Sequence, residues 1–305
     1  MKRDFLHIID LSKEEIFEIF DLSTQLKKET NEGTTHHHLK GKTLAMIFQK
    51  PSARTRVSFE TGMYQLGGHA LYLSPNDIGM GKREAVKDIA EVLSRYNDLI
   101  MARVFDHDHV VKLAKHGSVP VINGLSDYNH PCQVMADIFT VLEHRKTLDD
   151  LKVVYIGDGN NVTHSWMILT QRIPMELVIV CPEGFEPDRE TVNQTRDFGI
   201  STVEISHDPM TSVNGADVIY TDVWASMGHE SKAVERKKKF EPFQVNERLM
   251  KAAGEQAFFM HCLPAHRGDE VTDDVIDGSQ SIVFDEAENR LHVQKAIMVF
   301  LMNSI

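Results

Sequence analysis

The segment 50–56, Lys-Pro-Ser-Ala-Arg-Thr-Arg, places two hydroxyl groups and two guanidinium groups within five residues. It follows an apolar run at 43–48 and opens a helical pattern, so it stands at a strand-to-helix junction. A helix N-terminus presents free backbone N–H groups and a positive dipole end, which together favour anions such as phosphate. The alternative is a plain Ser52 cap followed by solvated arginines. Because Arg54 and Arg56 cannot easily share one helix face, we expect at least one of them to be structural.

Two further polar positions follow predicted strands of the same half. Arg103 ends the apolar run 99–103, and ligands of open α/β sheets bind beyond the carboxyl ends of strands. Pairing with a nearby aspartate explains Arg103 equally well. His130 and Gln133 belong to the helix start His-Pro-Cys-Gln, where proline suits the first helical position. Their side chains can be aimed at one point, although a glutamine three residues after a cap also reaches back to it in a capping box.

The second half of the chain has its own strand-end motifs. The segment 157–161, Gly-Asp-Gly-Asn-Asn, suggests a dinucleotide loop, but the third glycine of G-x-G-x-x-G falls at Val162. We therefore interpret it as a tight strand-to-helix turn whose asparagine side chains point into a cleft. Asp222 follows the apolar run 218–221, and an acid there suits an ammonium group, with the segment behind it able to close over the ligand.

Cys262 lies between His261 and a Leu-Pro pair, directly after an apolar run. A cysteine beside a histidine suggests a nucleophile, but side chains at adjacent positions rarely meet. Cys262 with His266 also lacks the second ligand pair of a zinc site, so we predict no metal. We interpret two other features as solvated surface: the histidine tract 36–38 and the basic run 236–239.

The elements that must position these residues alternate between β-branched or apolar runs and helical patterns, which is typical of parallel α/β sheets. Four strands are expected in the first half of the chain, at 43–48, 70–73, 99–103 and 119–122. Five are expected in the second half, at 152–156, 177–180, 202–205, 218–221 and 258–260.

Helical patterns lie between these strands, and apolar residues at helical spacing define their buried faces. One predicted face contains Val57, Met63 and Leu66, and the glycine pair 67–68 ends that helix. The next predicted face contains Val86, Ile89, Leu93 and Tyr96. A long helix from His130 to about Arg145 connects the two series of strands, and a last helix begins at about Glu286.

Composition limits the classes of partner. The chain has 305 residues, about two domains by length, with Lys+Arg 33, Asp+Glu 45 and a net charge of −12. This charge argues against nucleic acid or an anionic membrane as the main partner, but not against a small anion in a local basic pocket. No apolar run approaches the roughly 18–20 residues of a membrane span, and the N-terminal segment lacks a signal-peptide core. Three widely spaced cysteines fit a reducing cytosol, so we expect a cytoplasmic protein.

Taken together, these segments resemble the ornithine carbamoyltransferase branch of the aspartate/ornithine carbamoyltransferase family. The matches, in chain order, are Ser52-Ala53-Arg54-Thr55-Arg56 to S-T-R-T-R, His130-Pro131-Cys132-Gln133 to H-P-x-Q, Asp222-x-x-x-Ser226-Met227-Gly228 to D-x-x-x-S-M-G, His261-Cys262-Leu263-Pro264 to H-C-L-P, and Glu288-Asn289-Arg290. The first two motifs are shared by carbamoyltransferases generally. The S-M-G and H-C-L-P motifs distinguish the ornithine enzymes from the aspartate enzymes.

The resemblance implies a fold of two doubly wound parallel-sheet α/β domains joined by long helices. Residues 1–148 would bind carbamoyl phosphate and residues 149–305 would bind ornithine, with the last helix, about 286–305, packing back on the first domain. It also implies a homotrimer or a multiple of trimers, with sites at subunit interfaces and no cofactor. The reaction would move the carbamoyl group of carbamoyl phosphate to the δ-amine of L-ornithine, giving L-citrulline and phosphate in arginine biosynthesis or in a step of the urea-cycle type.

The resemblance also implies residue roles. Arg103 and His130 would polarise the carbamoyl oxygen, Gln133 would hold the carbamoyl amide, and Cys262 would lie beside the attacking amine; Arg103, His130 and Cys262 are the catalytic set. Carbamoyl phosphate would be bound by Ser52, Ala53, Arg54, Thr55, Arg103, His130, Gln133, Cys262, Leu263 and Arg290. Ornithine would be bound by Asn161, Asp222, Ser226 and Met227.

Two positions depart from the family pattern. Ala53 stands where threonine is usual, and we expect little loss because backbone amides do much of that loop's work. Gly79 stands where the family often has Gln or His reaching into the neighbouring subunit's site, which puts phosphate affinity in question but not the type of reaction.

Three alternatives stay open at this point. A carbamoyltransferase acting on another amine, such as putrescine, would keep the chemistry, although Asp222 favours a free α-amino group. A nicotinamide-dependent dehydrogenase built on the second half is disfavoured by the missing third glycine. A non-catalytic binding protein that kept the fold is suggested by Ala53 and Gly79, but the other motif residues are all present.

Overall fold

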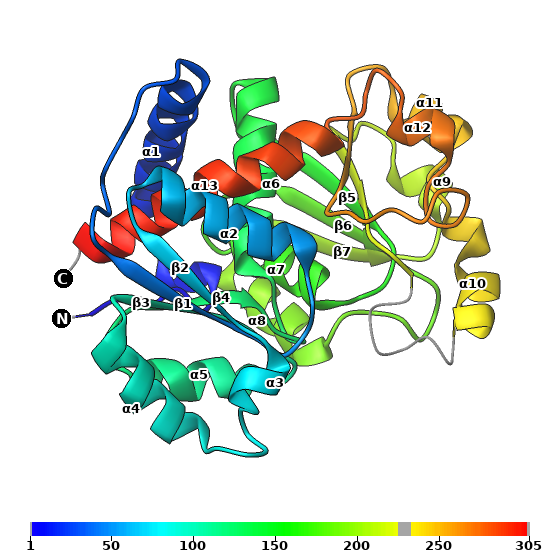
Figure 1. Ribbon diagram of the computed structural model, residues 1–305. Coiled ribbons are helices and arrows are strands. Elements are labelled where there is room, and N and C mark those ends of the chain that lie inside the picture. Colours follow the sequence, from blue (N-terminus) through cyan, green and yellow to red (C-terminus); the bar gives the residue numbers. More distant parts are fainter. Residues whose placement is uncertain (1, 225–232, 304–305) are drawn as a thin grey trace. The chain divides into compact units, whose positions relative to one another are not determined.

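The computed structural model describes residues 2–224 and 233–303 (Figure 1). The chain forms two compact units, which we treat separately. Unit 1 consists of Met1–Ala136 together with Asn289–Ile305, and unit 2 consists of Asp137–Glu288. The division between them falls inside two long helices, α6 (Pro131–Arg145) and α13 (Val283–Asn303). The second part of α13 therefore belongs to unit 1, as the expectation of a returning last helix requires.

Unit 1 contains a four-stranded parallel sheet in the order β2-β1-β3-β4. Its strands are β1 (Thr43–Phe48), β2 (His69–Leu73), β3 (Leu99–Arg103) and β4 (Val121–Leu125). Its helices before α6 are η1 (Ile8–Asp10), α1 (Lys13–Asn31), α2 (Ala53–Gln65), α3 (Pro75–Ile78), α4 (Val86–Tyr96) and α5 (His107–His116). Helices α4 and α5 lie on one face of this sheet and α2 lies on the other (Figure 1).

The core of unit 1 explains why these segments form these elements. Strands β1, β3 and β4 are buried on both faces, which is why they appear in the sequence as continuous apolar runs. One core cluster joins Ala45 and Ile47 of β1 to Ile89 of α4 and Leu113 of α5. Strand β2 is at the sheet edge and is only partly buried, and its sequence is correspondingly less apolar.

Unit 2 contains a five-stranded parallel sheet in the order β7-β6-β5-β8-β9. Its strands are β5 (Lys152–Ile156), β6 (Glu176–Val180), β7 (Thr202–Ser206), β8 (Val218–Thr221) and β9 (Phe258–His261). Its shorter helices are α7 (Asn161–Leu169), α8 (Arg189–Phe198), α9 (Pro209–Ser212), α10 (Ala233–Phe240), η3 (Glu241–Phe243), α11 (Glu247–Ala253) and α12 (Asp273–Ile276). One core cluster packs Val154, Ile219 and Phe259 of the sheet against Leu249 of α11 and Val275 of α12.

The expected fold class is confirmed, with two parallel α/β sheets carrying helices on their faces. Eight of the nine expected strands agree with the structure to within one residue at each end. Strand 119–122 is the exception, because β4 begins at Val121 and continues to Leu125. Pro120 has no N–H for a sheet ladder, so the strand begins after it. The last helix begins at Val283, three residues before the expected start.

Two expectations about buried helix faces are wrong. On α2 the buried stripe is Thr55, Phe59 and Met63, so Val57 lies on the opposite side and is 58% exposed. On α4 the stripe ends at Ser94, and Tyr96 in the last position is 75% exposed. Apolar character alone placed these two residues in the core. None of the helices within 2–224 and 233–303 has the length and apolar character that a membrane crossing requires.

Candidate active site

The predicted residues of unit 1 lie at the point where the strand order of its parallel sheet reverses. Strands β1 and β3 are neighbours, with Phe48 paired to Arg103 at their carboxyl ends. From β1 the chain goes on to the edge strand β2, whereas from β3 it goes on to β4 on the other side. Ligands of open α/β sheets bind at such a switch point, outside the carboxyl ends of the strands. The N-terminus of α2 and Arg103 are both located at this point.

Ser52 caps α2, as the alternative interpretation of this segment expects. Its backbone is extended, with φ −163° and ψ 112°, and its Oγ accepts the Thr55 N–H at 3.3 Å. The Ser52 and Thr55 hydroxyl oxygens are 3.1 Å apart. The cap satisfies one N–H of the first turn, and two hydroxyl groups stand beside the remaining donors. The serine cap and an anion-binding site are therefore compatible interpretations of the same segment.

Two guanidinium groups converge on the first turn of α2. Arg103 at the end of β3 donates from Nη1 to Thr55 Oγ1 at 3.5 Å, and Arg290 of α13 donates from Nη2 to the same oxygen at 3.1 Å. Arg103 is 7% exposed, Arg290 is 4% exposed and Thr55 is fully buried. Two buried positive charges therefore face a helix N-terminus, a combination that suits a multiply charged anion.

His130 and Gln133 lie at the start of α6 and are both buried. The Gln133 N–H donates to the His130 carbonyl oxygen at 3.1 Å. Burial lowers the pKa of His130 well below its ordinary value, and the positive charges of Arg290, Arg103 and Lys50 lower it further. A neutral imidazole thus lies in a pocket of positive potential, and it can donate one hydrogen bond without adding another charge.

The other residues of the 50–56 segment serve different purposes. Arg56 pairs with Glu60 at 3.0 Å, and its guanidinium lies 4.0 Å from the Tyr72 ring centre, so Arg56 is the structural arginine that the spacing predicted. Ala53 and Arg54 are exposed at the start of α2.

Gly79 has a local structural reason for being a glycine. It caps the short helix α3 in the left-handed conformation, with φ 53°. A Cβ atom at this position would also lie 2.8 Å from Cβ of Arg83. The backbone here favours glycine on both counts.

The predicted residues of unit 2 also stand at a switch point, between β5 and β8. These strands pair in register, with Ile156 opposite Thr221. From β5 the chain proceeds to β6 on one side, and from β8 it proceeds to β9 on the other. The turn 157–161 and Asp222 therefore come together, as strand-end residues on both sides of such a point must.

Asp222 is the centre of the polar cluster in unit 2. Its Oδ2 accepts from Asn160 Nδ2 at 2.8 Å, and its Oδ1 accepts from Cys262 Sγ at 3.0 Å. Asn160 is also the N-cap of α7, where its Oδ1 accepts the N–H groups of Val162 and Thr163. One side chain thus fixes both the helix and the orientation of the Asp222 carboxyl. The resemblance gives Asn161 as an ornithine ligand, which stays a prediction, and the contact with Asp222 is made by its neighbour Asn160.

Cys262 is held as a thiol. Burial raises its pKa well above the ordinary value, and the negative charge of Asp222 beside it raises the pKa further. A cysteine nucleophile needs the opposite environment, with a base or a positive charge that stabilises the thiolate. The Cys262 sulfur is therefore suited to hydrogen bonding at this site.

Gly159 decides against a dinucleotide loop. A Cβ at this position would lie 2.2 Å from the Pro187 nitrogen and 2.5 Å from the Glu186 carbonyl carbon. The Gly159 N–H also donates to the Phe185 carbonyl oxygen at 2.9 Å. In a dinucleotide site the second glycine lets the pyrophosphate approach the backbone. Here the chain's own segment 185–187 occupies that space, which removes the structural basis of the dehydrogenase alternative.

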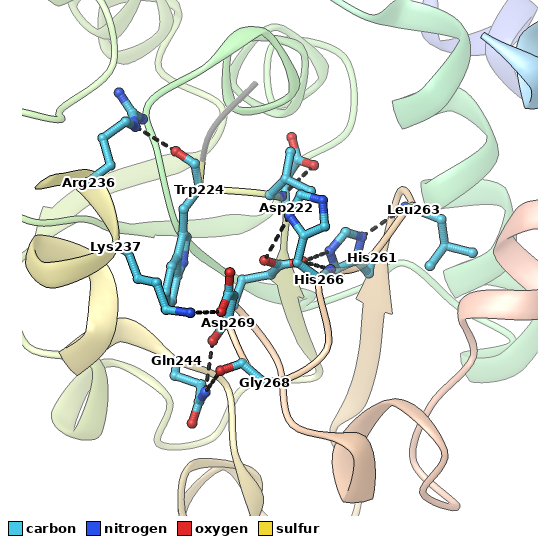
Figure 2. Close-up of polar contacts among 12 residues, drawn as sticks. Asp222, Trp224, Arg236, Lys237, Gln244, His261, Leu263, His266, Gly268 and Asp269 are labelled. Atoms are coloured by element: carbon cyan, nitrogen blue, oxygen red, sulfur yellow. Dashed lines mark hydrogen bonds and ion pairs between the residues drawn. The ribbon is translucent and has the colours of Figure 1, made fainter. Parts of the chain in front are cut away.

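His261 fixes the backbone that follows Cys262 (Figure 2). Its Nδ1 accepts the Leu263 N–H at 2.8 Å, and its Nε2 lies 3.2 Å from Oε1 of the buried Glu270. Leu263 has a left-handed backbone with φ 56°, which is uncommon for a leucine and marks a constrained position. The ligand atoms of Asp222, His261 and Cys262 lie within 4.8 Å of one another. Both His261 nitrogens are engaged, however, so metal coordination would have to break one of these contacts.

The expectation that segment 236–239 is a solvated face is wrong for Arg236 (Figure 2). Its Nε donates to the Trp224 carbonyl oxygen at 2.6 Å, and its Nη2 lies 2.5 Å from Asp158 Oδ2. Its guanidinium also lies 4.8 Å from the Phe185 ring centre and 5.3 Å from that of Phe240. Arg236 therefore joins the backbone just after Asp222 to the turn that carries Asn160. Lysines 237–239 are exposed, and Lys237 pairs with Asp269.

The expectation that the histidine tract 36–38 is solvated surface is wrong for His36. His36 is buried and lies 3.1 Å from Glu29, whereas His37 and His38 are exposed. Of the predicted ornithine-binding residues, Ser226 and Met227 lie outside the described residues.

Comparison with known proteins agrees with this arrangement. Two family models match the chain: the carbamoyl-P binding domain of aspartate/ornithine carbamoyltransferase over residues 3–143, and the Asp/Orn binding domain of the same family over residues 149–301. The chain belongs to the aspartate/ornithine carbamoyltransferase family.

Ornithine carbamoyltransferases are among the similar proteins of the family. The chloroplastic enzyme of Pisum sativum is 58% identical over 301 residues, which cover 98% of this chain and 80% of that protein. The anabolic enzyme of Pyrococcus furiosus is 54% identical, and the alignment covers 99% of this chain and 97% of that protein. The solved structure of the ornithine carbamoyltransferase from Pyrococcus furiosus matches with a TM-score of 0.95, covering 100% of this chain and 98% of that chain.

The environment of Cys262 predicts slow alkylation. At pH 8 iodoacetamide should modify Cys262 far more slowly than a free thiol, and the rate should still be rising at pH 9, because the raised pKa keeps the sulfur protonated. Asp222→Asn removes the neighbouring negative charge, so the rate at pH 8 should increase by about tenfold for each unit by which the pKa falls. Mass spectrometry of the Cys262 peptide measures the rate.

The other two cysteines serve as the control. Cys132 and Cys181 are buried, burial raises the pKa of each to about 12, and both should stay unmodified while the protein is folded. A Cys262 rate that already levels off by pH 7 would mean a thiolate and would contradict this account.

Proposed function

We propose that the chain catalyses transfer of the carbamoyl group of carbamoyl phosphate to the δ-amine of L-ornithine, giving L-citrulline and phosphate. The observation that carries the proposal is the convergence of Arg103 and Arg290 on Thr55 at the N-terminus of α2, in a chain of net charge −12. Family membership and relatives that are ornithine carbamoyltransferases support the same activity. They give the putrescine alternative no support.

In the proposed reaction, unit 1 binds carbamoyl phosphate. Ser52, Ala53, Arg54 and Thr55 would hold the phosphate, with the free N–H groups of α2 and the guanidinium of Arg290. When the neutral amine attacks the carbonyl carbon, a C–N bond forms and negative charge develops on the carbamoyl oxygen. The C–O bond to phosphate then breaks, and phosphate leaves with the proton that the amine loses. Arg103 and the neutral His130 would stabilise that charge, and their fixed, buried positions mean that they need no reorganisation in the transition state. Gln133 would hold the carbamoyl amide.

Unit 2 would bind ornithine and prepare its amine. Asp222 and Asn161 would hold the α-amino and carboxylate groups, and Ser226 and Met227 complete the predicted set. An alkylamine with a lysine-like pKa of about 10.4 is protonated at pH 7, so deprotonating it costs about 4–5 kcal/mol. The Cys262 thiol, which donates a hydrogen bond to Asp222, would accept a hydrogen bond from the amine through its sulfur, with the Leu263 carbonyl beside it. No cofactor enters this mechanism.

The activity is tested by measuring product formation with four acceptors. Carbamoyl phosphate with L-ornithine should give citrulline, whereas putrescine, aspartate and N-acetylornithine should give no comparable product. Asp222→Asn should raise the KM for ornithine by at least tenfold, since it removes the charge opposite the α-amino group. Equal turnover with putrescine would refute the proposed substrate, and absence of turnover with every amine would refute the proposed class of reaction.

We also propose that the chain acts as a homotrimer in the cytoplasm, with residues 1–148 and 149–305 as its two substrate domains. Unit 1 supports self-association, because α2 and the edge strand β2 expose large apolar side chains: Val57 by 58%, Tyr64 by 80% and Leu71 by 42%. The three cysteines are free thiols, as expected of a reducing compartment.

Light scattering should give about three times the chain mass of 34.6 kDa, and a monomer mass would refute the trimer.

A further inference from the structure

Lys295 is a buried lysine that the proposed mechanism does not use. It lies on the part of α13 that belongs to unit 1, and its side chain has no solvent exposure. Its Nζ donates to Thr30 Oγ1 of α1 at 2.8 Å and to Gln65 Oε1, at the last residue of α2, at 2.9 Å. A buried ammonium is costly, so a lysine kept at such a position needs a physical reason.

The charges around Lys295 show that the ammonium form is supported. The negative charge of Glu29 favours the charged form, and burial opposes it, so that the pKa of Lys295 is lowered to about 8. His36 lies 3.1 Å from Glu29, and burial is the main cause that lowers the pKa of His36. At neutral pH Lys295 is therefore still mostly protonated and holds both helices through charge-assisted hydrogen bonds.

Helices α2 and α13 are in close contact at Gly62. A Cβ at this position would lie 3.1 Å from Cγ of Lys295, 3.5 Å from Cδ1 of Leu291 and 3.5 Å from Cε of Met298. The absence of a side chain at Gly62 thus lets the stem of Lys295 lie against α2. Arg290, five residues before Lys295 on α13, donates a hydrogen bond to Thr55 in the first turn of α2. The two basic residues of α13 hold opposite ends of α2.

We propose that Lys295, seated on Gly62, is a positioning residue that sets α13 on α2 and so holds Arg290 at the anion-binding first turn. The proposal rests on the proposed function only in taking Arg290 and Thr55 as the phosphate site. Lys295 contacts no substrate and acts through Arg290. Loss of the two Lys295 hydrogen bonds leaves the first turn of α2 intact, but it allows α13 to shift along α2. This shift moves the Arg290 guanidinium away from the anion.

The test uses Lys295→Met in the full-length protein, with Lys28→Met as the matched control. Lys28 is on α1, and its side chain is 72% exposed. At pH 7 Lys295→Met should raise the KM for carbamoyl phosphate about three- to tenfold and weaken the binding of inorganic phosphate, measured by calorimetry, by the same factor. The KM for ornithine should change less than twofold, and Lys28→Met should change neither constant. Equal phosphate affinity in Lys295→Met and the original protein would overturn the proposal.

A double-mutant cycle separates positioning through Arg290 from a general loss of structure. In an Arg290→Gln background, Lys295→Met should change phosphate affinity by less than twofold, because the group that it positions has already been removed. A full additional loss in that background would show that Lys295 acts independently of Arg290 and would refute the inference. Because phosphate binding needs no turnover, this outcome is distinct from failure of the proposed reaction, which absence of citrulline would reveal.

Gly62→Ala provides a second variant, in which the affinity for carbamoyl phosphate should fall without a matching loss of stability. Alanine favours a helix interior more than glycine does, so the thermal midpoint should be little lowered or raised. The new Cβ displaces the Lys295 stem by a few tenths of an ångström, so the KM for carbamoyl phosphate should rise about two- to threefold. An unchanged KM would count against the positioning role, whatever the thermal midpoint.

Discussion

The structure of unit 1 depends on placing two buried guanidinium groups at one helix N-terminus. Arg103 and Arg290 both reach the Thr55 hydroxyl, although one ends a strand and the other belongs to the last helix. Like charges in a buried place repel each other, and the positive end of the α2 dipole adds to the repulsion. Rigid surroundings must therefore hold such an arrangement, and an anion that binds here would compensate its charge. The strand order, the serine cap and the contact of α13 with α2 are the surroundings that do so.

The polar cluster of unit 2 is built in the same way around a group of opposite charge, the carboxyl group of Asp222. Asp222 is held by Asn160 and by the Cys262 thiol, and Arg236 anchors the backbone on both sides of this cluster. The carboxyl group is thus presented in a fixed orientation and next to a sulfur that stays protonated. In the proposed function, a positively charged amino-acid substrate would be compensated here and a doubly charged phosphate would be compensated in unit 1. The two electrostatic environments would then divide the two substrates between the units.

Much of this arrangement could be predicted from the sequence, because parallel strands that are buried on both faces appear as unbroken apolar runs. The positions that follow those runs, such as Ser52, Arg103 and Asp222, are candidates for ligand binding by topology alone. Burial on helices was harder to predict: Val57 and Tyr96 are apolar yet exposed, because a one-dimensional pattern does not say where a helix meets its sheet or where it ends.

The remaining features depend on partners far away in the chain. Arg290 reaches Thr55 across 235 residues, and only the family resemblance pointed to it. Arg236 belongs to a basic run that looks solvated, and its two aromatic neighbours and Asp158 lie in segments that the local sequence does not reveal. Asn160 and Asn161 are adjacent and chemically identical, so only the geometry of the turn could show which one meets Asp222.

We infer that the hydroxyl group of Thr55 organises the anion site at the start of α2. Calorimetric titration of carbamoyl phosphate into the protein without ornithine, compared with Thr55→Val, tests this claim most directly. The substitution keeps the shape of the side chain and removes the oxygen shared by both arginines, so affinity should fall about tenfold or more. Arg56→Gln, at the structural arginine, should leave affinity unchanged. Equal affinity of Thr55→Val and the original protein would contradict the account.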